Sequence, residues 1–113
     1  MKTLEQCRAD HGAKLLGSIK IAGVEFCYGK PTRDAWRAMQ GGGMATRQGE
    51  GEDAVKRATA SIEAIEELAR GACLSHTPEE LEQAAERYYD TLVELGYAVL
   101  EAFRAEQEKL GKG

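Results

Sequence analysis

The sequence predicts an α+β fold, with a small N-terminal β-hairpin and packed short helices followed by two longer C-terminal antiparallel helices. Residues 18–28 alternate apolar and polar side chains, which is the period of a half-buried strand. After residue 53 the apolar residues recur at helical spacing instead. A glycine-rich stretch separates the two patterns. The chain of 113 residues is predicted to form one domain spanning 1–113.

The N-terminal segment from Thr3 to Lys14 predicts a short helix. Thr3 is a suitable N-cap residue, because its hydroxyl can accept a hydrogen bond from a free N–H of the first turn. Leu4, Cys7 and His11 follow at helical spacing, so they are expected on one face.

The next segment predicts a hairpin whose turn lies at Ala22 and Gly23. Ile19 and Ile21 alternate with a lysine before the turn, and Val24, Phe26 and Tyr28 continue the alternation after it. A lone hairpin is only marginally stable in water. We therefore expect a helix, a third strand or a second copy of the chain to cover its apolar face.

The stretch "CYGKPTRDAWRAM" resembles the end of a phosphate-binding loop but cannot act as one. Val24 stands where the loop needs its first glycine, and Pro31 follows Lys30 where a serine or threonine is required. Proline also lacks the N–H that such a loop directs at phosphate. We interpret this stretch as a corner that starts a short helix near Thr32, whose Trp36 should anchor it to the hairpin.

Residues 41–52 are predicted to be a flexible loop, because they are rich in glycine and lack periodicity. A helix should begin at Asp53, with an apolar stripe of Val55, Ala58, Ile62, Ile65, Ala69 and Ala72.

The second long helix has the clearest start, because Thr77, Pro78 and Glu80 form a capping-box pattern. We expect this helix to run unbroken to about Leu110. Its second half is apolar over a wide part of its circumference, which one neighbouring helix should not cover. This width predicts homo-oligomers and a protein-binding surface formed by Leu92, Leu95, Tyr97, Val99, Leu100 and Phe103.

The net charge of −4 argues against nucleic acid and membrane surfaces as partners, since both need clustered lysine and arginine. No apolar run has membrane-spanning length, and the polar N-terminus lacks a secretory signal. We therefore expect a cytoplasmic protein. Its three cysteines are an odd number and should be reduced there.

Two pairs of residues could together supply the ligands of a zinc site. Cys7 and His11 are four positions apart on the first helix, and Cys73 with His76 has the short spacing of a ligand pair. Neither pair belongs to a doubled CxxC or HxxxH pattern, which is typical of a zinc site. All four residues are therefore also consistent with core or surface positions. The glutamates are predicted to lie on solvated helix faces, and not as a general acid and base held in a pocket. We predict no catalytic residue, no metal and no cofactor, and hence no enzyme.

The order of these parts is similar to that of the tail assembly chaperones of long-tailed bacteriophages. The resemblance covers most of the chain, and "GVEFCYGKPT" and "ACLSHTPEEL" carry most of it. The segment "RYYD" from Arg87 to Asp90 departs from the family, which has a proline-containing segment there. The expected effect of this departure is a longer unbroken helix.

The resemblance implies a non-catalytic protein of phage or prophage origin that acts in the cytoplasm of the bacterial host. Such a chaperone coats the tape measure protein before the tail tube polymerises around it, with the tail tube protein as a second expected partner. The alternative is a small helical adaptor or a metal-binding regulatory protein of a mobile element.

Overall fold

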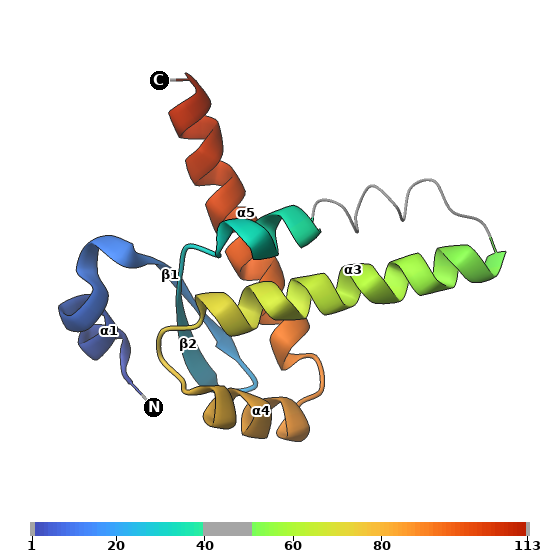
Figure 1. The fold of residues 1–113 in the computed structure, drawn as a ribbon. Helices are drawn as coiled ribbons and strands as arrows, with labels where there is room; N and C mark the ends of the chain where they lie inside the picture. The colour runs from blue at the N-terminus through green and yellow to red at the C-terminus, as the bar shows by residue number, and fades with distance from the viewer. Residues whose placement is uncertain (1, 40–50, 113) are drawn as a thin grey trace.

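A computed structural model of the chain describes residues 2–39 and 51–112, and it confirms the α+β prediction (Figure 1). The N-terminal part contains one antiparallel hairpin, and the C-terminal part contains two helices of 22 residues each. The elements are α1 (Leu4–His11), the short 3₁₀ turn η1 (Gly12–Lys14), β1 (Leu15–Ile21), β2 (Val24–Gly29), a helical segment over 33–39, α3 (Gly51–Ala72), α4 (Pro78–Arg87) and α5 (Thr91–Lys112).

Helix α1 begins at the predicted cap. The Gln6 N–H donates to Thr3 Oγ1 over 3.2 Å, and the Gln6 side chain accepts from the Thr3 N–H over 2.8 Å. This reciprocal pair satisfies two N–H groups that the helix itself leaves free. The helix ends at His11, because residues 12–14 tighten into the 3₁₀ turn.

The hairpin has the predicted turn and an earlier start. Ala22 and Gly23 both have positive φ angles, of 50° and 81°, which suits the tight two-residue turn between twisted strands. The register pairs Ile19 with Phe26 and Ile21 with Val24. Strand β1 begins at Leu15, and its pairing is irregular between Leu15 and Gly17.

The outer edge of β2 is covered by the segment that follows α3. The Leu74 N–H donates to the Cys27 carbonyl over 2.8 Å, and the Cys27 N–H donates to Ser75 Oγ over 3.0 Å. The Ser75 carbonyl in turn accepts from the Lys2 N–H over 2.7 Å. Residues far apart in the sequence therefore satisfy the backbone groups of this edge.

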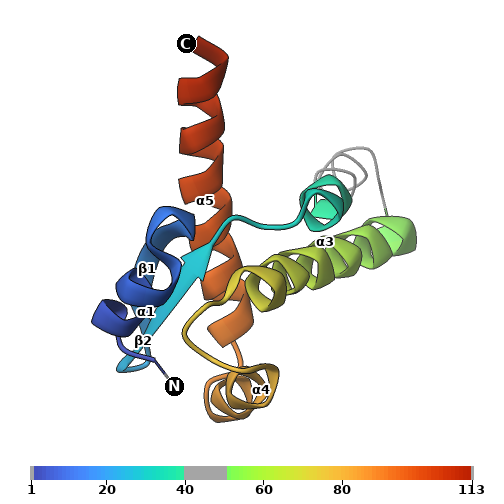
Figure 2. The same cartoon turned by 60° about the vertical axis from the view of Figure 1, so that its left-hand side comes forward.

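Helices α3 and α5 cross steeply in both views and do not lie antiparallel (Figures 1 and 2). The crossing point is at Gly96, where an added Cβ would clash with the Ile65 carbonyl oxygen. Two helices that cross at a steep angle are in contact over a short length and diverge on either side of it. The antiparallel arrangement predicted for the pair was therefore wrong.

The steep crossing also changes the predicted stripe of α3. Ile62 remains 47% exposed, because it precedes the crossing, whereas Leu68 is fully buried although it was not assigned to the stripe. Ile65, Ala69 and Ala72 are buried as predicted. Gly51 and Glu52 belong to α3. The rest of the predicted loop, residues 41–50, and the side chains of Val55 and Ala58 lie outside the described part of the chain.

The prediction of one unbroken C-terminal helix was wrong, because a corner at residues 88–90 divides it into α4 and α5. Tyr88 leaves the helical region, with φ −135° and ψ 105°. The buried Thr91 hydroxyl donates to the Tyr88 carbonyl over 2.6 Å. Tyrosine, aspartate and threonine are weak helix formers, and a threonine hydroxyl readily replaces a helical bond to a carbonyl.

The start of α4 is confirmed. The Glu80 N–H donates to Thr77 Oγ1 over 3.2 Å, and the Thr77 N–H donates to Glu80 Oε1 over 3.0 Å. Among the described helices, none is both long and apolar enough to cross a membrane.

The buried residues form two clusters that share α5. The larger cluster joins the hairpin to α3, α4 and α5 and consists of Ile21, Phe26, Tyr28, Ala69, Ala72, Leu81, Leu92, Leu95 and Val99. The smaller cluster joins the helical segment 33–39 to α3 and α5 through Met39, Ile65, Leu68 and Leu100. Helix α3 also contributes to both clusters, so α3 and α5 together form the centre of the core.

Candidate partner-binding groove

Four of the six residues predicted to bind a partner lie inside the chain's own core. Leu92, Leu95, Val99 and Leu100 are at most 8% exposed, because the hairpin, α3, α4 and residues 33–39 surround this half of α5. A buried side chain cannot contact a partner unless the core opens, so these four residues are covered in the chain alone and their role in binding stays a prediction. Tyr97 is 48% exposed and Phe103 is half-buried, so these two residues of the predicted binding surface are accessible in the chain alone.

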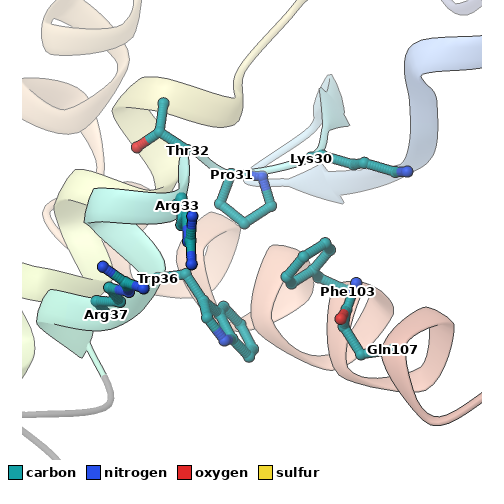
Figure 3. A pocket seen from close by; sticks show the side chains of 8 residues that line it. All are labelled: Lys30, Pro31, Thr32, Arg33, Trp36, Arg37, Phe103 and Gln107. Carbon is teal, nitrogen blue, oxygen red and sulfur yellow. The ribbon is translucent and has the colours of Figure 1, made fainter. Parts of the chain in front are cut away.

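Phe103 lines a groove of about 370 Å³ between α5 and the chain that follows the hairpin (Figure 3). Lys30, Pro31 and Thr32 form one end, and the helical segment 33–39 forms one side. The complete lining is Lys30, Pro31, Thr32, Arg33, Trp36, Arg37, Phe103 and Gln107.

Local sequence explains why the chain turns away from the hairpin here. Pro31 has a fixed φ and no N–H, so it ends the strand pairing. Thr32 then caps the next helix, since its Oγ1 accepts from the Ala35 N–H over 3.1 Å. Trp36 and both arginines of this helix line the groove, and Trp36 points toward Phe103.

An aromatic pair forms the apolar wall of the groove. The Trp36 and Phe103 rings meet edge to face, with centroids 4.8 Å apart and planes at 78°. Trp36 was predicted to pack on the hairpin, and that placement was wrong. The hairpin is already packed against α5 and α1, so Trp36 packs instead beside the smaller core cluster.

The charged side chains of the groove differ in their pairing. Lys30 Nζ lies 3.1 Å from Glu106 Oε1, so its charge is compensated. Among residues 2–39 and 62–111, whose side chains the structure describes, Arg33 and Arg37 have no ion-pair partner. By contrast, Arg70 lies within 4.0 Å of carboxylate oxygens of Glu66, Glu67 and Glu82. The groove therefore presents two guanidinium groups that no described carboxylate pairs with, and they lie beside an aromatic wall.

The candidate zinc ligands, which are two cysteines and two histidines, contact other residues. His11 Nε2 lies 3.5 Å from Lys2 Nζ. His76 Nδ1 lies 2.7 Å from Ser75 Oγ, and its ring stacks on Phe26 with centroids 4.4 Å apart. Burial lowers the pKa of His76. Within the described ranges, no group of three or more acidic, cysteine or histidine side chains could hold a metal ion.

The three cysteines are near one another, where α1 packs on the hairpin. Cys7 and Cys27 are both fully buried, and Cys73 Sγ lies 3.9 Å from Ser75 Oγ. Burial, followed by a hydrogen bond with Cys7, raises the pKa of Cys27 to about 12. A thiol with such a pKa stays protonated at neutral pH and is a poor nucleophile.

Sequence reasoning missed the groove although part of its signal is local. Arg33, Trp36 and Arg37 stand at helical spacing, which places them on neighbouring positions of one helix face. Phe103 and Gln107 come from α5, and no local pattern connects them to residues 30–37.

Comparison of the chain with protein-family models, curated proteins and solved structures finds no match.

Proposed function

We propose that the protein is a non-catalytic tail assembly chaperone of a long-tailed bacteriophage or prophage. In this proposal it binds the tape measure protein in the cytoplasm of the bacterial host, with the tail tube protein as a second partner. The observation that carries a binding function is the groove, where the Trp36–Phe103 pair lies beside two arginines that no described carboxylate pairs with. The motifs of the hairpin and of the α3–α4 junction support the choice of partner.

The composition of the groove is that of a protein-binding surface. Tryptophan and arginine are enriched among the residues that dominate binding energy at protein interfaces. The two walls are held by the protein core, since residues 33–39 and α5 both contribute to the smaller buried cluster. A partner would therefore meet a groove that is formed before binding, which lowers the entropic cost of association.

Self-association of the chain remains a prediction with less support. It was based on the wide apolar circumference of α5, and the chain itself covers most of that circumference. Sedimentation over a range of concentrations tests it directly.

The proposed function can be tested by co-expressing the chain with the tape measure protein of the same gene cluster. We expect the two proteins to co-elute, and Phe103→Ala to reduce the amount of tape measure protein recovered. Leu110→Ala is a matched control, because Leu110 is an exposed apolar residue of the same helix that does not line the groove. A wild-type chain that fails to co-elute with the tape measure protein would contradict the proposal. A mobile-element adaptor would give that same result.

A further inference from the structure

The two arginines of the groove are one helical turn apart. Arg33 and Arg37 are both exposed, and their four-residue spacing places them on neighbouring positions of one helix face. Figure 3 shows both side chains on the helix that carries Trp36. An arginine fork binds a carboxylate through two parallel hydrogen bonds. The rim of the groove can therefore bind two carboxylates at a spacing of one turn.

The apolar wall lies directly beside this rim. Trp36 projects from the helix toward Phe103 of α5, and the two rings are in edge-to-face contact (Figure 3). Trp36 is only partly buried, so part of the indole can still be covered by a ligand. An aliphatic side chain placed there would be removed from water on several sides.

We propose that the groove binds an acidic amphipathic helix of the partner. Two carboxylates one turn apart on that helix pair with Arg33 and Arg37, and an aliphatic side chain between them packs against Trp36 and Phe103. This inference rests on the proposed function, because it specifies the partner segment that the same groove recognises. The partner segment is expected to be helical because of the spacing of the two arginines. Carboxylates at positions i and i+4 of a partner helix have the same spacing as Arg33 and Arg37.

The charge of the rest of the chain favours an acidic peptide over a nucleic acid. Stacking on tryptophan beside arginine also suits single-stranded nucleic acid, which is the main competing ligand. The net charge of −4, however, opposes a polyanion that extends beyond the groove. The third cation, Lys30, is already paired with Glu106. A short segment with two carboxylates fits this limited positive charge.

Binding can be measured without any label. Trp36 is the single tryptophan of the chain, so its fluorescence reports directly on the groove. The probe is a synthetic helical peptide that repeats Glu-x-x-Leu-Glu, and the control peptide replaces each glutamate by glutamine. We expect the acidic peptide to shift the Trp36 emission to shorter wavelength and to bind about tenfold more tightly than the control, because charged hydrogen bonds are lost in the latter. The affinity should fall as salt is raised to about 0.5 M.

The double variant Arg33→Gln/Arg37→Gln should lose this preference for the acidic peptide. Arg8→Gln/Lys20→Gln is the matched control, because it removes the same charge from exposed positions on α1 and β1 and should leave the affinity unchanged. Equal binding of the two peptides, or an unchanged affinity in the groove variant, would overturn the inference. A single-stranded oligothymidylate that binds while the acidic peptide does not would also overturn it.

The same variants separate this inference from the proposed function. If the chain binds the tape measure protein but not the acidic peptide, the function stands and the peptide class is wrong. If the chain binds the peptide through its arginines but not the tape measure protein, the recognition chemistry is correct and the partner is wrong.

Discussion

Phe103 and Leu110 continue the apolar stripe of residues 91–100 into the second half of α5, where the surroundings differ. In residues 91–100 the hairpin, α3, α4 and residues 33–39 bury Leu92, Leu95, Val99 and Leu100. In residues 101–112 the helix extends past the hairpin, and Leu110 is 65% exposed (Figure 1). The difference shows that an apolar stripe indicates what can be buried, whereas the neighbouring elements decide what is buried. The candidate groove lies where α5 leaves the main core.

The largest expected effect tests this comparison directly. Leu95→Ala should destabilise the protein by about 3 kcal/mol, because the leucine is fully buried and the substitution leaves a cavity. Leu110→Ala removes the same atoms from an exposed position and should change the free energy of unfolding by less than about 0.5 kcal/mol. Denaturant unfolding of both variants measures the difference. Equal effects would mean that the two halves are not distinguished by burial.

The crossing with α3 can be broken by a single methyl group. Gly96→Ala should destabilise the protein by about 2 kcal/mol, since the added Cβ would clash with the Ile65 backbone and force the helices apart. Gly71→Ala is the control, because an added Cβ at this position near the end of α3 has no neighbour within 4 Å. The control should be stabilised by roughly 0.5 kcal/mol through its better helix propensity. Thermal unfolding that shows the same sign for both variants would contradict the observed crossing.

The aromatic wall connects the second half of α5 to residues 33–39. Trp36→Ala should lower the free energy of unfolding by about 2 kcal/mol. This loss is smaller than that expected for a fully buried tryptophan, because the indole is only partly covered. A double-mutant cycle with Phe103→Ala should give a coupling energy of about 1 kcal/mol, as expected for an edge-to-face pair. Additive effects of the two substitutions would show that the rings do not interact.

The smallest effect concerns the ion pair at the end of the groove. Lys30→Met should change stability by no more than about 0.5 kcal/mol, because the lysine side chain is 54% exposed and solvent screens the pair. The expected change should shrink further in high salt. A large, salt-independent loss in denaturant unfolding would instead mean that Lys30 packs as part of the core.

The sequence predicts well those features that depend on neighbouring residues. The caps at Thr3 and Thr77 and the turn at Ala22 and Gly23 are set by side chains within four positions. The hairpin and the two long helices follow from hydrophobic periods that local reading recovers. These local signals were sufficient for the fold class.

The features that were missed depend on contacts between distant residues. Nothing near Gly96 indicates that it must admit the Ile65 backbone, and nothing near Trp36 indicates Phe103 as its neighbour. The apolar repeat continues through the corner after Arg87. Only the weak helix propensities of the residues there indicate that the helix ends. Four residues of the predicted binding surface are buried, because the apolar repeat does not indicate which neighbouring elements cover it.

The coverage of β2 by Leu74 and Ser75 has a consequence for synthesis on the ribosome. The Cys27 N–H and its Ser75 acceptor are separated by 48 positions, so the hairpin is translated well before the segment that covers its edge. At a synthesis rate of about 5–20 residues per second, this interval is roughly 2–10 s. During that time the edge of β2 has free N–H and C=O groups, which are a template for pairing between nascent chains. The yield of native protein should therefore depend on how crowded the translating ribosomes are.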